Sequence, residues 1–303
     1  MQRSIKYAVL LYLVTLALNS QAALQVVTTT EDLAAIARAI GGATVEVVSL
    51  TPGTRDPHFA EAKPSMIRKV YRADLLILVG ADMEIGWLPP LLQSARNGRV
   101  QPGNAGYLDL SLVVPLLGQM AEPVSRAMGD VHANGNPHYW LDPRNGARMA
   151  RAIADRLSEL DPQQRDSYQA RRVDFEQTLA RKLEQWQAAL SPVQGQTVIA
   201  YHTSFVYLAD AFGFTITDEV EPKPGIAPSA AHLSQLVRRI KAEQIDRLIM
   251  EPYYERRSAA YLHDQTGIRI AVLPQSVGAL PQIKTYFDLF DRIVAILTQP
   301  GSS

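Results

Sequence analysis

The sequence predicts an α/β fold of two lobes, each a parallel sheet with flanking helices, joined by one long rigid helix. Three observations support this prediction. In the first half of the chain, short apolar runs alternate with stretches of helical spacing, which is typical of βαβ units. A long, polar and charged stretch of helical character follows at 163–190. The alternation then starts again and continues nearly to the end of the chain.

Residues 1–22 differ from the rest and are expected to form a signal peptide. Arg3 and Lys6 give a positive start, an uncharged apolar stretch follows, and Ser20 and Ala22 place small side chains at a cleavage site. The uncharged stretch has about 12 residues, whereas a membrane-spanning helix needs about 20. We therefore expect export to the periplasm through a cleaved signal peptide.

The first lobe is assigned to residues 23–160. Its strands are expected where short apolar runs are bounded by polar or glycine residues, at 24–28, 45–50, 75–80 and 107–112. Its helices are expected where apolar residues recur with helical spacing, at 31–40, 64–72 and 144–160. The pairs Thr29-Thr30 and Gly41-Gly42 begin and end the first of these helices.

The linking helix is assigned to residues 161–192, between Asp161-Pro162 and Ser191-Pro192. A single long helix in this place would act as a strut and allow only small movements of the lobes. The second lobe is assigned to residues 193–303, with strands at 197–201, 214–217, 247–251 and 268–273. Its helices are expected at 204–212, 231–242, 259–266 and 286–298.

Composition narrows the chemistry that the chain can perform. The 303 residues include 30 basic and 30 acidic side chains, and no basic stripe is present to neutralise phosphates, so nucleic acid is excluded as a partner. The chain has no cysteine. A metal site must then use His, Asp, Glu or water. Lipid attachment at a cysteine after the signal peptide is excluded for the same reason, so the protein is not expected to be a lipoprotein.

Three of the six histidines occupy positions where α/β proteins bind ligands. His58 follows the second predicted strand, His138 lies in a loop before the last helix of the first lobe, and His202 directly follows the first strand of the second lobe. Ligands of open α/β sheets bind beyond the carboxyl ends of the strands. The sequence therefore predicts a metal site in the cleft between the lobes, and three imidazoles suit zinc.

The other three histidines give a weaker signal. His132 lies in a glycine-rich loop beside Asp130 and is either exposed or an auxiliary metal contact. His232 and His263 fall within amphipathic helices and are expected at the surface.

Several motifs recur along nearly the whole mature chain in the order found in one protein family. They are Asp56-Pro57-His58 with Pro64-Ser65; Ala73-Asp74-Leu75 running to Gly80; Asn136-Pro137-His138-Tyr139-Trp140-Leu141-Asp142-Pro143; Tyr201-His202 with Phe205, Tyr207 and Phe212-Gly213; Pro228-Ser229; Glu251-Pro252; and Thr266-Gly267. In these motifs the chain resembles the cluster A-I metal-specific solute-binding proteins of ABC transporters, which deliver zinc, manganese or iron.

The resemblance implies a periplasmic substrate-binding protein, not an enzyme, that captures a divalent metal ion and delivers it to a membrane permease with its ATPase for import. It also implies a monomer whose metal ligands are His58, His138 and His202. Zinc members favour histidine at the third ligand, whereas manganese and iron members commonly place a carboxylate there. His202 therefore favours Zn²⁺ over Mn²⁺ or Fe²⁺.

The chain departs from the family at the fourth ligand. Members often have an aspartate after the last strand, and here Gln275 occupies that position. A neutral amide is a poor zinc ligand. Either water fills the fourth position or a nearby carboxylate does, and Glu251, at the end of the preceding strand, is the candidate. The alternative role of Glu251 is to hydrogen-bond loops at the cleft or to support a ligating histidine.

Other functions stay open at this point. A manganese or iron receptor of the same family would use the same cleft, and an adhesin could bind metal incidentally. A zinc hydrolase could use three histidines with Glu251 as the base, but the chain lacks the H-E-x-x-H helix of metalloproteases.

Overall fold

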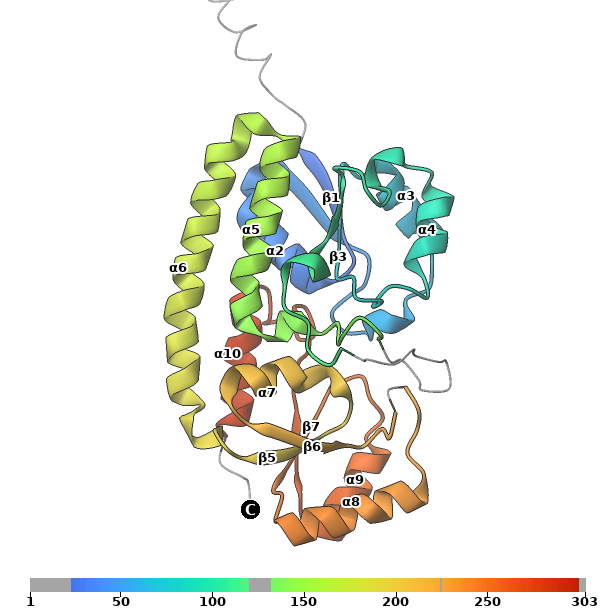
Figure 1. Ribbon diagram of the computed structural model, residues 1–303, viewed down its shortest axis with the longest axis vertical. Helices are drawn as coiled ribbons and strands as arrows, with labels where there is room; N and C mark the ends of the chain where they lie inside the picture. Colours follow the sequence, from blue (N-terminus) through green and yellow to red (C-terminus); the bar gives the residue numbers. More distant parts are fainter. Residues whose placement is uncertain (1–22, 120–131, 224, 300–303) are drawn as a thin grey trace, which may run out of the picture.

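The computed structural model describes residues 23–119, 132–223 and 225–299, so the predicted signal peptide lies outside the described residues. Within them, two parallel sheets of four strands each form two lobes, and the predicted α/β fold is confirmed (Figure 1). The strand order is β2-β1-β3-β4 in the first lobe and β6-β5-β7-β8 in the second. The strands of the first lobe are β1 (Leu24–Thr28), β2 (Val45–Ser49), β3 (Leu75–Leu78) and β4 (Tyr107–Asp109). Those of the second lobe are β5 (Thr197–Ala200), β6 (Thr215–Glu219), β7 (Arg247–Met250) and β8 (Arg269–Val272).

Helices cover both faces of the first sheet. Its helices are α2 (Glu31–Gly41), α3 (Pro64–Arg72), α4 (Leu88–Ala95) and α5 (Pro143–Leu160). Alternate residues of one strand enter different cores: Val26 packs in the core that contains α2 and α5, and Val27 packs in the core that contains α3 and α4. Burial on both faces explains why these strands read as nearly continuous apolar runs.

The second lobe repeats this arrangement. Its helices are α7 (Val206–Phe212), α8 (Ala230–Glu243) and α9 (Arg257–Thr266), and the chain continues to α10 (Tyr286–Leu297). Ile199 and Leu248 pack in a core that contains α8 and α9. Val198, on the other face of the sheet, packs in the core that also contains α2 and α5 of the first lobe. One hydrophobic core therefore extends from lobe to lobe.

The long helix α6 (Arg165–Ala189) runs alongside both lobes and contacts α2, α5 and α10 (Figure 1). At its far end, Trp186 donates a hydrogen bond from Nε1 to Oδ1 of Asp291 in α10 at 2.8 Å. The rings of Trp186 and Phe290 lie with their centroids 5.0 Å apart. Within the described residues, no helix is both long and apolar enough to cross a membrane.

Three local predictions differ from the structure. The sequence prediction has no element between 81 and 106, where the structure has helix α4 with Pro89 and Pro90 in its first turn. Proline is tolerated in the first turn, where its missing N–H has no partner to lose. The strand predicted at 107–112 ends at Asp109, whose side chain accepts from the N–H of Ser111 and begins a 3₁₀ turn. The long helix begins at Arg165, after a separate 3₁₀ turn.

Candidate metal centre

The structure brings His58, His138 and His202 together. One ring nitrogen of each lies within 4.8 Å of one ring nitrogen of the other two. The ring centroids are 5.1 Å apart for His58 and His138, 5.9 Å for His58 and His202, and 5.7 Å for His138 and His202. His58 follows β2, His138 precedes α5, and His202 follows β5. The three imidazoles therefore meet between the lobes, at the ends of strands from both sheets.

Two similar tripeptides hold the two histidines of the first lobe. In Asp56-Pro57-His58, the Asp56 carboxylate accepts from the backbone N–H of His58 at 2.9 Å and lies 2.7 Å from its Nδ1. In Asn136-Pro137-His138, the side-chain oxygen of Asn136 makes the same two contacts, at 2.9 Å and 3.0 Å. The Asn136 amide also donates from Nδ2 to the carbonyl of Thr203, which fixes its oxygen toward His138.

The second lobe supplies the equivalent partner for His202. Its Nδ1 lies 2.9 Å from Oε2 of Glu221, which is buried just beyond β6. All three acceptors are oxygens, so in each neutral imidazole Nδ1 carries the proton and Nε2 keeps its lone pair. The Nε2 of His138 is buried and has no hydrogen-bond partner among the described residues. The site thus presents imidazole nitrogens in the protonation state that a metal requires.

Burial and charge set the protonation of these groups. Burial, with help from neighbouring His58 and His202, holds the pKa of His138 well below its usual value. Burial also lowers the pKa of His202, but the hydrogen bond to Glu221 and the charges of Glu251 and Asp56 outweigh it and raise that pKa overall. Burial raises the pKa of Asp56, but its bonds to His58 outweigh this and leave the pKa below its usual value.

Glu251 lies near this cluster but outside the set of atoms that fall within 4.8 Å of one another. Its side chain is fully buried at the end of β7, and neither carboxyl oxygen makes a hydrogen bond of normal geometry in the described part of the chain, although the Ser204 side chain interacts with it. Burial raises the pKa of this carboxyl to about 7, and the neighbouring His202 opposes the rise. Glu251 is therefore a buried acid beside His202, with only a weak contact to Ser204.

The side-chain oxygen of Gln275 already has a hydrogen-bond partner. Its Oε1 accepts a hydrogen bond from the hydroxyl of Tyr253, and its backbone carbonyl accepts from Nε1 of Trp140 at 2.9 Å. The Gln275 amide is buried, and its Nε2 has no partner among the described residues. This side chain presents an N–H donor, which cannot bind a metal ion.

Of the remaining histidines, His132 contacts the cluster, and the other two contact backbone carbonyls. His132 is half-buried, and its Nε2 lies 3.2 Å from Nε2 of His58 with the two rings stacked. Burial, reinforced by His58 and His202, lowers the pKa of His132 to about 3. His232 and His263 instead contact backbone carbonyls, of Glu219 and Ile268.

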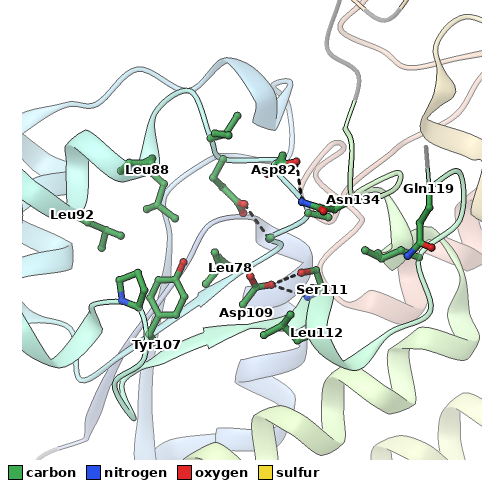
Figure 2. A pocket seen from close by; sticks show the side chains of 17 residues that line it. Leu78, Asp82, Leu88, Leu92, Tyr107, Asp109, Ser111, Leu112, Gln119 and Asn134 are labelled. Carbon is green, nitrogen blue, oxygen red and sulfur yellow. Dashed lines mark hydrogen bonds between the residues drawn. The ribbon is translucent and has the colours of Figure 1, made fainter. Parts of the chain in front are cut away.

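A separate cavity of about 580 Å³ lies in the first lobe, beyond the ends of β3 and β4 (Figure 2). Apolar side chains such as Leu88 and Leu92 line one wall, and none of the six histidines lines it. Asp82 on its rim accepts a hydrogen bond from Nδ2 of Asn134 at 3.3 Å. The cavity is thus separate from the histidine cluster, but its rim is tied to the loop that carries His132.

Sequence reasoning found the three converging histidines but missed the residues that orient them. The repetition of Asp-Pro-His and Asn-Pro-His is a signal that could have identified Asp56 and Asn136, because an Asx side chain commonly bonds the backbone two residues on. Glu221 carries no such signal. It reaches His202 through the pairing of neighbouring strands, which the local sequence does not encode.

Comparison with known proteins places these features in context. Residues 26–299 match the family described as "Zinc-uptake complex component A periplasmic" (ZnuA). The "High-affinity zinc uptake system protein ZnuA" of Yersinia pestis is 28% identical over 285 residues, which are 88% of each chain. The "Manganese ABC transporter substrate-binding lipoprotein PsaA" of Streptococcus pneumoniae is 26% identical and aligns over 83% of this chain and 79% of its own. A crystal structure of ZnuA superposes with a TM-score of 0.75 at 25% identity, over 91% of this chain and 98% of that one.

Proposed function

The chain belongs to the family of periplasmic zinc-uptake components, and from this membership we propose that it captures one divalent metal ion, zinc by preference, and delivers it to an ABC permease. The permease and its ATPase would then import the ion. We propose that the protein acts as a monomer in the periplasm and is not an enzyme. The relatives named above are zinc and manganese transport proteins, which supports the class of function.

The main support for the proposal is that hydrogen bonds orient the rings of His58, His138 and His202 before any ion binds. Each Nδ1 is held by an oxygen acceptor, which leaves the Nε2 lone pair of each neutral ring for a metal ion, and one ring nitrogen of each histidine lies within 4.8 Å of those of the other two. Zinc binds imidazole readily in tetrahedral sites, whereas manganese prefers oxygen ligands in larger coordination shells. A site with three imidazoles supports zinc over manganese or iron as the preferred cargo.

Glu251, the candidate from the sequence for the fourth position, is proposed to lie beside the ion and to balance its charge. Its buried carboxyl makes no hydrogen bond of normal geometry in the described chain, so a nearby ion would compensate its burial. Glu251 would balance the charge from next to His202, whose pKa its own charge helps to raise. Gln275 has no part in coordination under this proposal.

Metal analysis of the protein purified from the periplasm, followed by competition between zinc and manganese, tests the function. We expect one zinc per chain and displacement of manganese by zinc. Stoichiometric manganese without any preference for zinc would favour the manganese receptor of the same family. Gene context supplies an independent check, because a transport receptor is expected beside genes for an ATPase and a permease.

Capture should also weaken as the pH falls, because ligating imidazoles must be neutral. His202 should be more sensitive than His138, because Glu221 and the nearby acids raise the pKa of His202 despite its burial, whereas burial lowers that of His138. Zinc affinity measured by chelator competition at about pH 7.5 and about pH 5.5 should be much weaker at the lower value. Equal affinity at both values would contradict ligation by imidazole.

A further inference from the structure

We propose that His132 supplies a fourth imidazole to the ion, so that zinc is held by His58, His132, His138 and His202. This inference rests on the proposed function and makes it more specific. Many family members use an aspartate as the fourth ligand, and this chain has Gln275 at that position. His132, which lies in a different loop, would take the place of that aspartate.

The nearby oxygen atoms are largely in use. The side chains of Asp56, Asn136 and Glu221 each accept from the Nδ1 of a histidine, and turning any of them to the metal would release that histidine. The Oε1 of Gln275 accepts from Tyr253. The Glu251 carboxyl lies outside the cluster of ligand atoms within 4.8 Å of one another, as His132 does, but Glu251 is fully buried and has less freedom to move toward the ion than the half-buried His132.

The contact between His132 and His58 has the dimension of one edge of a zinc tetrahedron. A tetrahedral ion with Zn–N bonds of about 2.0–2.1 Å separates its nitrogens by roughly 3.3–3.4 Å. The Nε2 atoms of His132 and His58 are 3.2 Å apart. Since Nδ1 of His58 donates to Asp56, its Nε2 carries no proton, and a proton on Nε2 of His132 bridges the two rings without metal. When that proton moves to Nδ1 of His132, both Nε2 lone pairs can bind one ion.

Coordination requires one movement. Because His132 is not part of the 4.8 Å cluster, its ring must swing toward His138 and His202 as the ion binds, with the contact to His58 as the pivot. His132 is only half-buried, so this rotation does not require repacking of the core.

The loop around His132 is anchored close to the site. Asn134 donates to Asp82 on the rim of the first-lobe cavity (Figure 2), and the N–H of Gly135 bonds the carbonyl of His132 at 3.2 Å. The backbone N–H of Asn136 bonds the carbonyl of Leu117 at 2.7 Å. These bonds hold the backbone of the turn at the mouth of the cleft, so that the His132 ring stays within reach of the ion.

X-ray absorption at the zinc edge tests the inference, because scattering by imidazole rings counts the histidine ligands directly. The samples are the zinc-loaded full chain, His132→Ala, Glu251→Gln and the control His263→Ala. We expect four imidazoles in the wild type, in Glu251→Gln and in the control, and three imidazoles with one oxygen in His132→Ala. Zinc affinity of His132→Ala should fall by about tenfold or more, as for loss of a metal-supporting group.

A spectrum of His132→Ala identical to that of the wild type would overturn the inference while leaving the function intact. Loss of an oxygen scatterer in Glu251→Gln, with no change in His132→Ala, would overturn it in favour of Glu251. Absence of bound zinc in the wild type would instead contradict the proposed function as well. Unfolding midpoints of the metal-free variants check that each chain is folded.

Discussion

At the scale of single residues, the cleft is organised around the Nδ1 atoms of its histidines. Asp56 and Asn136 each use one side-chain oxygen to hold both the backbone and the ring of the histidine two positions later. The intervening Pro57 and Pro137 restrict the backbone between the two bonds. The imidazole is thereby fixed before any ion arrives, so little side-chain entropy is lost when one binds.

Asp56→Ala should weaken zinc binding by about 10- to 100-fold, because His58 loses the group that fixes its tautomer and orientation. Asp56→Asn should lose much less, since it recreates the Asn-Pro-His arrangement that this chain already uses at 136–138. Chelator competition measures both affinities. Asp246→Ala, which removes a half-exposed partner of Arg269, is the control. Equal affinities of Asp56→Ala and the control would refute this role.

Glu84 predicts a pH dependence that is independent of metal. It is buried beyond β3 and accepts hydrogen bonds from Thr29 and from the backbone N–H groups of Val79 and Gly80. Burial outweighs these bonds and raises its pKa from 4.5 to about 7. Between these values the folded chain keeps a proton that the unfolded chain has released, so stability falls as the pH rises through this window.

The loss attributable to Glu84 reaches roughly 3 kcal/mol above pH 7, from about 1.4 kcal/mol per pKa unit. Urea unfolding of the metal-free chain at pH 5 and pH 8 should therefore show a smaller difference for Glu84→Gln than for the wild type. The test is how the unfolding free energy changes with pH, and not its absolute value, because the Glu84→Gln substitution also changes the hydrogen bond to Gly80. If the unfolding free energies of the wild type and of Glu84→Gln changed with pH in parallel, the raised pKa of Glu84 would be ruled out.

The convergence of His58, His138 and His202 could be predicted because histidine is rare in this chain and because a position after a strand has a fixed meaning in parallel sheets. The sequence could not identify Glu221 as the partner of His202, since that contact depends on how β6 pairs with β5. Nor could the sequence show that the hydroxyl of Tyr253 donates a hydrogen bond to the side-chain oxygen of Gln275. Such contacts between loops depend on tertiary structure that no local pattern records.

At the scale of elements, strands buried on both faces were predictable because their apolar runs are continuous. Helix α6 is different, since most of its surface is polar. Its fully buried side chains form a narrow stripe of Tyr168, Phe175, Leu179 and Trp186. The length and end signals of α6 could be predicted from the sequence, but its partners could not.

Trp186 should be one of the most important residues for holding the end of α6. Trp186→Ala removes a buried ring that packs on Phe290 and bonds Asp291, and should destabilise the chain by about 3–5 kcal/mol. Trp186→Phe keeps the ring contact but loses the hydrogen bond and should cost less. Denaturant unfolding measures both changes. Equal losses for the two variants would show that ring packing against α10 contributes little.

At the scale of the whole molecule, the two lobes are joined by more than α6. Asp32 in α2 accepts from the backbone N–H of Val277 at 2.9 Å, and Trp140 donates to the carbonyl of Gln275. The hydroxyl of Tyr286 donates to the carbonyl of Trp140 at 2.6 Å. Together with the core that runs from lobe to lobe, these bonds resist a wide hinge opening.

Zinc binding should therefore move the lobes by only a few ångströms. The chain has no cysteine, so spin labels can be placed without background at Arg68→Cys in α3 and Lys241→Cys in α8, both exposed. Distance distributions from electron paramagnetic resonance, with and without zinc, should nearly coincide. A large shift of the distribution would show that α6 bends and that the lobes close as hinged bodies.

His58, His138 and His202 are proposed to capture zinc together between the lobes. A crystal of the zinc-loaded chain, measured on both sides of the zinc absorption edge, tests it most directly. We predict a single strong anomalous peak between the Nε2 atoms of these three residues, about 2.0–2.1 Å from each. A zinc peak elsewhere, or none in this cluster at full zinc loading, would contradict the claim.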